Sequence, residues 1–276
     1  MENGQRKEEG SHKAVQVHVS MIDVHCHLEQ KDYDSDRDEV IERCRRELKA
    51  IVTSCAHPKD FDLTMKIVQE HKGFVFATAG IHPEYIKDIS TDEINNFIAE
   101  LQHNRDKIVG IGESGLDYYY IKEPKWQEKQ KDLFITSIEL AKKLGKSLVI
   151  HCRNAHEDTI KILEENDAKD VVLHLWGAHA FVSKINECKW YVSFGPLIAT
   201  SKTHKRIARD MPLERILLET DSPWFGGKTP EGKPIRGEPI NIRLVAKKIA
   251  EIKELSFEDV WKQCGKNAIK LFSLPI

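Results

Sequence analysis

The chain alternates short apolar segments with longer amphipathic stretches. Segments of this kind are typical of repeated βα units, whose strands form a parallel sheet. One (β/α)8 barrel of ~250 residues holds eight such units, so the 276 residues predict an α/β TIM barrel in a single domain. The eight candidate strands are Met21–Val24, Ala50–Ser54, Phe74–Ala79, Ile108–Ile111, Ser147–Ile150, Val171–Leu173, Tyr191–Phe194 and Ile216–Leu218.

The amphipathic stretches carry recognisable helix signals. Ser90 followed by Glu93 has the spacing of a capping box at the start of a helix. Pro124 suits the first turn of a long helix that a glycine ends. Two more helices, Asn241–Ile252 and Phe257–Phe272, follow the last strand, and we expect both to cover the barrel exterior.

The beginning of the chain and one loop differ from this repeat. Residues 1–12 are polar and predict a tail, which places the barrel domain at residues 13–276. Three valines at alternate positions between 15 and 19 predict an early start of the first strand or a small extra strand before it. After the eighth strand, residues 222–239 are rich in glycine and proline, as expected of a functional loop.

Composition restricts the class of protein. Hydrophobic residues make up 40% of the chain and charged residues 31%, which excludes wholesale disorder and a fibrous fold. Lysine and arginine total 42 against 44 acidic residues, so there is no broad basic field and any nucleic-acid contact must be local or assisted by metal. No apolar run reaches the ~18 residues of a membrane span, and we expect a cytoplasmic protein without membrane contact. The six cysteines contain no C-x-x-C pair and are interpreted as reduced thiols.

Polar residues follow the predicted strands in a recurring way. His25 and His27 stand just past the first strand, where alternate positions point to the same side. Among 13 histidines chance alone places roughly 0.6 H-x-H pairs, so position rather than the motif is informative. The carboxyl ends of barrel strands meet at one rim, which is where barrel enzymes keep their active sites. The other polar residues that follow strands are His82, Glu113, His151, His174, Glu219 and Asp221.

This set of side chains predicts a metal site. Imidazoles together with carboxylates match a centre for Zn, Mn or Mg better than a dithiol site or an all-oxygen cage. Two divalent ions ~3.5–4 Å apart can share one carboxylate and one water, whose pKa they lower towards neutrality. The sequence therefore predicts two divalent metal ions at the rim.

The motifs around these residues resemble those of the TatD family of metal-dependent deoxyribonucleases, which belongs to the amidohydrolase-like barrel superfamily. The resemblance extends from about Met21 to Phe272, and the motifs occur in the family's order. They are Asp23-Val24-His25-Cys26-His27-Leu28, Gly80-Ile81-His82-Pro83, Gly110-Ile111-Gly112-Glu113-Ser114-Gly115-Leu116-Asp117-Tyr118, His151-Cys152-Arg153, His174 and Glu219-Thr220-Asp221-Ser222-Pro223.

The resemblance implies a division of the ligands between the two ions. His25 and His27 are expected to hold one metal, His151 and His174 the other, with Glu113 as the bridge. Catalysis is expected of Glu113 and of Asp221, a carboxylate beside the first metal.

Four further residues receive roles from the same resemblance. Asp221 is expected to complete the first metal site and to orient the attacking water or take its proton. His82 and Arg153 are expected to receive the phosphate, and Glu219 to support a ligand from behind or to bind an additional ion. Asp117 is interpreted as a hydrogen-bond acceptor that fixes its loop rather than as a ligand.

The chain departs from the family pattern at two places. Leu175-Trp176-Gly177-Ala178 follows His174, where the family usually has an aromatic residue and then Ser or Thr before Gly. Arg236-Gly237-Glu238-Pro239 precedes Asn241, so no family role is transferred to Arg236 or Asn241. The aromatic residues near the rim are candidates either for stacking bases or for packing loops. These are Tyr118, Tyr119, Tyr120, Trp176 and Trp224.

A small basic cluster follows the seventh strand, and a solvated helix face explains it as well as phosphate contacts do. It consists of Lys202, His204, Lys205 and Arg206. The function implied by the resemblance is hydrolysis of phosphodiester bonds in DNA by an exonuclease-like enzyme, with nucleic acid as substrate and no protein partner. The alternatives are a hydrolase of another ester or amide (RNA, aminoacyl-tRNA or a small molecule) and a non-catalytic, metal-stabilised binding protein.

Overall fold

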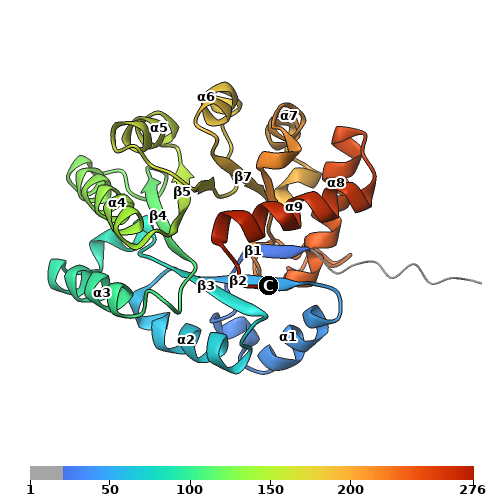
Figure 1. Cartoon of the computed structure of the whole chain (residues 1–276), viewed down its shortest axis with the longest axis horizontal. Coiled ribbons are helices and arrows are strands. Elements are labelled where there is room, and N and C mark those ends of the chain that lie inside the picture. The colour runs from blue at the N-terminus through green and yellow to red at the C-terminus, as the bar shows by residue number, and fades with distance from the viewer. Residues whose placement is uncertain (1–20) are drawn as a thin grey trace, which may run out of the picture.

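Eight parallel strands form one sheet in the order β1 to β8, with the helices outside it (Figure 1). The computed structural model describes residues 21–276, so the predicted tail and the alternating valines lie outside the described residues. The single (β/α)8 barrel predicted from the repeat is confirmed. The strands are β1 (Ile22–Cys26), β2 (Ala50–Cys55), β3 (Val75–Ala79), β4 (Gly110–Asp117), β5 (Ser147–Arg153), β6 (Val171–Leu173), β7 (Tyr191–Phe194) and β8 (Ile216–Leu218).

The helices alternate with these strands and agree with the sequence signals. They are α1 (Arg37–Arg45), α2 (Phe61–Glu70), α3 (Thr91–His103), α4 (Pro124–Leu144), α5 (His156–Glu165), α6 (Val182–Glu187), α7 (Lys202–Asp210), α8 (Ile242–Lys253) and α9 (Phe257–Phe272). Ser90 and Glu93 form the predicted capping box of α3. Gly145 ends α4 with a left-handed φ of 63°, a conformation that glycine adopts without steric cost.

Three predicted strands are wrong in extent, because each continues beyond its apolar segment. β1 extends to Cys26, β4 to Asp117 and β5 to Arg153, whereas apolar composition ends near Val24, Ile111 and Ile150. The parallel pairing of β4 with β5 continues through Gly115↔His151 and Asp117↔Arg153. Backbone pairing therefore does not end where the apolar side chains end.

Helix α9 does more than the predicted covering of the barrel exterior. The C-terminal end of α9, including Leu271 and Phe272, packs into a buried cluster with residues of the strands such as Ile22, Val52 and Val149. The Ser147 hydroxyl at the start of β5 donates a hydrogen bond to the Leu271 carbonyl. This apolar packing closes the amino end of the barrel, because those strand residues point inward and need a partner there.

β8 meets β1 at the carboxyl ends of the two strands. The Asp221 N–H donates to the His25 carbonyl (2.9 Å), and the His27 N–H donates to the Ser222 carbonyl (2.7 Å). The side chain of Asp23 reinforces this contact, since Oδ1 accepts from the N–H groups of His25 (3.2 Å) and Thr220 (3.1 Å). The residues that follow β1 and β8 are thereby held side by side.

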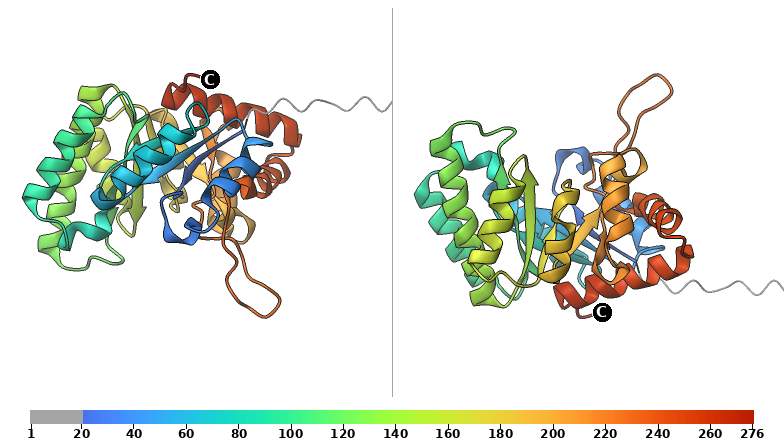
Figure 2. Two further views of the ribbon diagram at one scale, coloured as in Figure 1. Left: turned by 90° about the horizontal axis from the view of Figure 1, so that it is seen from below. Right: turned by 90° about the horizontal axis from the view of Figure 1, so that it is seen from above.

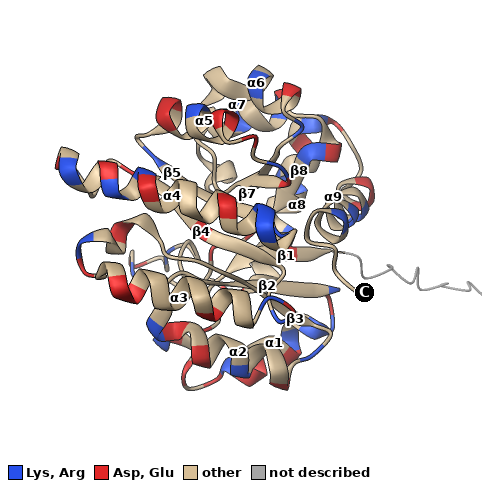
Figure 3. Ribbon diagram, turned by 60° about the vertical axis from the view of Figure 1, so that its left-hand side comes forward, with Lys and Arg blue, Asp and Glu red and all other residues tan. Residues whose placement is uncertain are grey.

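The loop after β8 projects from the barrel on the side opposite to the C-terminus (Figure 2). Basic and acidic residues are interspersed along helices α1 to α4 (Figure 3). Within residues 21–276, no helix combines the length and the apolar character needed to cross a bilayer.

Candidate metal centre

Glu113, buried on β4, presents one carboxylate oxygen to His25, which lies within β1, and to His27, just past that strand. Its Oε2 lies 3.3 Å from His25 Nε2 and 4.0 Å from His27 Nε2. Asp221 Oδ1 faces the same two nitrogens at 3.7 Å and 3.4 Å. The two Nε2 atoms are 3.2 Å apart, so all four side chains converge on one point.

The other carboxylate oxygen of Glu113 faces a second set of imidazoles. Oε1 lies 2.8 Å from His151 Nδ1, 3.5 Å from His82 Nε2 and 3.9 Å from His174 Nε2. His82 Nε2 is also 3.1 Å from His151 Nδ1, so these two rings and Glu113 form a group able to hold an ion. The sequence interpretation placed His82 with the phosphate, whereas the structure also brings it into the cluster.

A glycine places Glu113 within reach of both sets. Gly112 has a φ of 134°, and a Cβ at this position would lie 2.3 Å from the Val149 carbonyl oxygen of β5. Only glycine allows β4 to approach β5 so closely here. This approach brings Glu113 next to His151, which lies two residues beyond Val149.

Three of the histidines have a carboxylate behind them, on the ring nitrogen that faces away from the cluster. Such partners fix the tautomer and the orientation of a metal-binding imidazole and raise its basicity. The pairs are His27 Nδ1 with Glu29 Oε1 (3.1 Å), His151 Nε2 with Asp117 Oδ2 (3.0 Å) and His174 Nδ1 with Glu219 Oε2 (2.9 Å). Glu219 is fully buried and Glu29 is almost fully buried.

Asp117 and Glu219 each do more than support a histidine. Asp117 Oδ1 accepts from the N–H groups of Tyr119 (2.9 Å) and Tyr120 (2.8 Å), which is the loop-fixing contact expected from the sequence. Glu219 Oε1 accepts from the Leu175 N–H at 3.1 Å and so anchors the loop after β6.

Glu29 is a residue that the sequence interpretation missed. It continues the alternation of positions 25 and 27, and this spacing was the available signal. Thr53 Oγ1, on the neighbouring strand β2, donates to its Oε2 at 3.3 Å. Its Oε1, which faces His27, also accepts from Gln30 Nε2 at 3.1 Å, so Glu29 is held through both carboxylate oxygens.

The electrostatics of the cluster favour ionised carboxylates. Burial raises the pKa of Glu113, but the imidazoles around it, chiefly His82 and His174, outweigh burial and hold the pKa well below its usual range. Burial likewise opposes ionisation of Asp221, yet its hydrogen bond to His27 leaves its pKa lowered. Burial lowers the pKa of His174, but the charges of Glu219 and Glu113 outweigh burial and raise this pKa to about 10. A cation is therefore well matched to this cluster, because it would replace protons that the carboxylates now stabilise.

Arg153 lies on β5 beyond His151 and stacks on two tyrosines. Its guanidinium carbon is 3.8 Å from the ring centre of Tyr119 and 4.8 Å from that of Tyr120. Within residues 21–276, no ion pair joins Arg153 to a carboxylate, so its N–H groups remain free for an anion such as phosphate.

Several residues near the rim pack loops instead of facing a substrate. Trp176 is fully buried and its Nε1–H donates to the Ala178 carbonyl at 2.8 Å, which confirms the packing interpretation. The Tyr118 hydroxyl donates to Asp158 at 2.6 Å. Of the basic cluster after β7, His204 is buried and hydrogen-bonded to Ser201, so the four residues do not form one basic face.

Arg236 and Asn241 stabilise the loop that follows β8. Arg236 makes a bidentate contact with Asp36 (both 2.7 Å) and donates to Glu238 at 3.0 Å. Asn241 Oδ1 accepts from the Glu238 N–H at 2.8 Å. These contacts tie the base of the loop to the start of α1.

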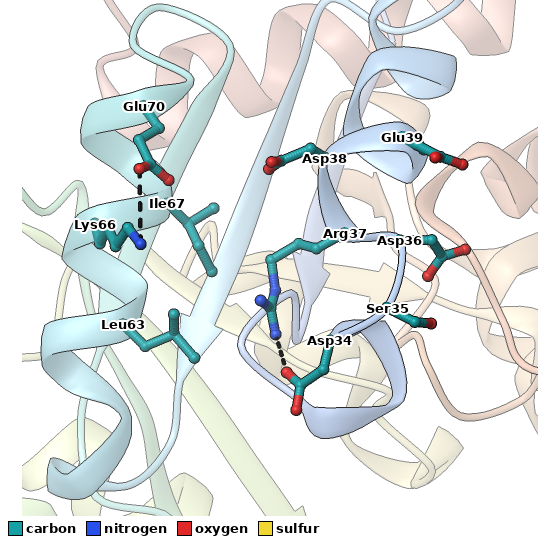
Figure 4. A pocket seen from close by; sticks show the side chains of 10 residues that line it. All are labelled: Asp34, Ser35, Asp36, Arg37, Asp38, Glu39, Leu63, Lys66, Ile67 and Glu70. Atoms are coloured by element: carbon teal, nitrogen blue, oxygen red, sulfur yellow. Dashed lines mark hydrogen bonds and ion pairs between the residues drawn. The ribbon is translucent and has the colours of Figure 1, made fainter.

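A hollow of about 280 Å³ between α1 and α2 contains no residue of the cluster (Figure 4). Residues 34–39 and four side chains of α2 line it. Two ion pairs lie in its lining, Arg37 with Asp34 (2.6 Å) and Lys66 with Glu70 (3.8 Å). This hollow is therefore separate from the candidate metal centre.

The protein family described as "TatD related DNase" matches residues 22–273 of this chain. This chain belongs to the TatD family. TatD membership makes it a metal-dependent hydrolase, and its buried His/Glu groups could hold a metal ion.

Relatives of this TatD chain cover nearly its whole length. The human deoxyribonuclease TATDN3 is 32% identical over 264 residues, which span 92% of this chain and 95% of that protein. The uncharacterized metal-dependent hydrolase YabD of Bacillus subtilis is 35% identical over 262 residues, 92% of this chain and 99% of the relative. The crystal structure of YjjV, a TatD homologue from Escherichia coli, has a TM-score of 0.82 at 22% identity and covers 93% of this chain and 99% of that one. That similarity shows the shared barrel fold.

Proposed function

We propose that this TatD protein hydrolyses phosphodiester bonds of DNA with two divalent metal ions, in an exonuclease-like manner. One observation carries the proposal: the two oxygens of Glu113 face two separate sets of imidazoles, at 3.3 Å from His25 and at 2.8 Å from His151. A carboxylate in this position is suited to bridging two cations. The name of the human relative, a deoxyribonuclease, supports DNA as the substrate class.

The donor atoms fit the proposed ions. Imidazole nitrogens and carboxylate oxygens are ligands common to Zn, Mn and, for the oxygens, Mg. His25, His27 and Asp221 would hold the first ion together with Glu113. When bound, two such ions polarise the phosphoryl oxygens and acidify the attacking water.

The second ion would be held by the imidazoles on the Oε1 side of Glu113. His151 is the nearest of them and His174 the expected partner, while His82, at 3.5 Å from Oε1, is a further candidate ligand. Glu219 keeps Nε2 of His174 turned towards the cluster, since its carboxylate binds Nδ1.

Residues at the edge of the cluster would orient the water and bind the phosphate. Asp221 has a lowered pKa, so its carboxylate is ionised and able to orient a water molecule and to accept its proton. Arg153 presents a planar set of donors that matches two phosphate oxygens. His82 has two candidate roles, as a ligand of the second ion or as a contact of the phosphate, and its Nε2 can fill one of them at a time.

The unpaired guanidinium of Arg153 favours an anionic phosphodiester over a neutral ester or amide, which needs no such counter-charge. The set of ligands that includes Asp221 resembles an open catalytic site more than a closed structural one, which argues against a non-catalytic binding protein. RNA and aminoacyl-tRNA remain the alternatives closest in chemistry.

The direct test uses purified protein with Mg, Mn or Zn on end-labelled single- and double-stranded DNA and on RNA of the same sequence. We expect metal-dependent shortening of DNA from one end, mapped to the nucleotide, and its loss in Asp221→Asn. Cleavage of RNA alone, or of a neutral ester with no action on either nucleic acid, would overturn the proposal.

A further inference from the structure

Trp224 is an exposed aromatic side chain directly beside the metal centre. Its ring centre lies 4.7 Å from that of His27, at an interplanar angle of 63°. About half of its surface, 49%, faces solvent. Tryptophan is highly buried on average, and the other tryptophan near the rim, Trp176, is fully buried.

The backbone that carries Trp224 is held firmly in spite of this exposure. The Trp224 N–H donates to the Asp221 carbonyl at 3.1 Å, and the Gly237 N–H donates to the Pro223 carbonyl at 2.7 Å. A Cβ on Gly237 would lie 2.5 Å from the Trp224 carbonyl oxygen, so the two ends of the loop pack as closely as glycine permits. The loop thus presents the indole at a fixed place next to His27.

A second exposed aromatic group lies at the other end of the cluster. Tyr119 and Tyr120 are 47% and 52% exposed and follow Asp117, whose carboxylate binds His151. Trp224 contacts His27, and Glu113 lies between His27 and His151. The exposed aromatics therefore stand on both sides of the position where a phosphodiester would meet the cluster.

We propose that Trp224 is the stacking platform of a nucleobase subsite that binds an unpaired base next to the scissile phosphate. The inference rests on the proposed function, because a phosphodiester held on the cluster places its neighbouring nucleosides within the reach of these rings. Aromatic side chains stack on any base and need no particular sequence, but a base inside a duplex has no free face to offer. Trp224 would therefore select strands with a free or frayed end.

The test compares two oligonucleotides that differ only in their bases. One is an ordinary single strand and the other carries abasic residues at the terminal positions, and both have phosphorothioate linkages that prevent cleavage. Stacking of one base contributes ~1–3 kcal/mol, so Trp224→Ala should raise the Kd of the ordinary strand by roughly 5- to 150-fold. It should leave the Kd of the abasic strand unchanged, and Trp224→Phe should restore most of the affinity.

Two controls separate stacking from damage to the site. Leu244→Ala removes another exposed apolar side chain, 65% exposed on α8, and should change neither Kd. Metal content, measured by mass spectrometry, should be the same in all variants. A terminal 2-aminopurine should be quenched by the wild-type protein and much less by Trp224→Ala.

The outcomes are decisive. An equal loss of affinity for both strands, an unchanged Kd for the ordinary strand, or loss of metal in Trp224→Ala would each overturn the subsite. If the wild-type protein cleaves no DNA with any ion, the proposed function fails, while the 2-aminopurine measurement still shows whether Trp224 binds a base.

Discussion

Replacing Glu29 should weaken metal binding while the barrel stays folded. Its Oε1 lies 3.1 Å from His27 Nδ1, and Thr53 Oγ1 donates to its Oε2 at 3.3 Å. The carboxylate thereby turns Nε2 of His27 towards Asp221 and the cluster. Glu29→Gln keeps the shape and one acceptor oxygen but loses the charge, whereas Glu29→Ala loses both.

The magnitude follows from the contact between two buried groups. A hydrogen bond to a charged group contributes ~1.5–3 kcal/mol, which corresponds to a change in Kd of roughly 10- to 150-fold at ~1.4 kcal/mol per tenfold. Measured losses for carboxylates behind a metal-binding histidine are similar, ~10–100-fold. We therefore expect about tenfold weaker binding in Glu29→Gln and about 100-fold in Glu29→Ala.

The pH dependence of binding should change as well. Burial lowers the pKa of His27, but the charges and hydrogen bonds of Glu29 and Asp221 raise it well above its usual value. The metal-free imidazole therefore keeps its proton to higher pH than an ordinary histidine, and an incoming ion must displace that proton. Affinity should rise with pH in the wild-type protein, and it should rise less steeply in Glu29→Ala, because the pKa of His27 is lower there.

Calorimetric titration of the metal-free proteins with Zn²⁺, at neutral and at mildly alkaline pH, measures both effects. Glu70→Ala is a matched control, since that glutamate is exposed on α2 and pairs with Lys66. Thermal unfolding without metal checks that the variants fold. A Glu29→Ala protein that binds Zn²⁺ as tightly as the wild type at both pH values would refute this role of Glu29.

Four other changes test the remaining assignments. Glu113→Gln should lose metal occupancy and turnover together, and two ions retained at wild-type turnover would contradict the bridge. Asp221→Asn should lower turnover ~100-fold or more, as is usual for a positioned acid or base, and a near-normal rate would exclude it as the base. Arg153→Lys should raise KM for phosphodiesters at unchanged metal content, whereas an equal effect on a neutral ester would exclude the phosphate contact. Deletion of residues 1–12 should leave metal content and activity unchanged, and loss of metal would show that the functional domain begins earlier than residue 13.

The fold was predictable because its signal is local. β6, β7 and β8 have the bounds that the apolar segments predict, and α9 has its predicted bounds as well. Strand β4 differs most, since it begins at Gly110 and continues to Asp117. Apart from Ile111 and Leu116, this strand consists of glycines and buried polar residues, which carry no apolar pattern.

The candidate site was predictable only as a set of positions. His25, Glu113 and Asp221 could be named from the sequence, because the carboxyl ends of parallel strands share one rim. The placement of Glu113, which lies within β4, also needed the close approach of the backbone at Gly112. The pairing of each imidazole with its partners could not be predicted. Thr53 of the next strand holds the other oxygen of Glu29, and nothing in the sequence indicates this contact.

The repeat of strands and helices, the rim residues and the family motifs can all be identified from the order of side chains along the chain. Three features depend on long-range packing: which ring nitrogens face Glu113, the closure of the amino end of the barrel by α9, and the burial of Trp176 beside a half-exposed Trp224. Both tryptophans follow strands and look alike in sequence. Their exposure depends on which neighbouring loops pack over them, and that packing exists only once distant segments have met in the folded barrel.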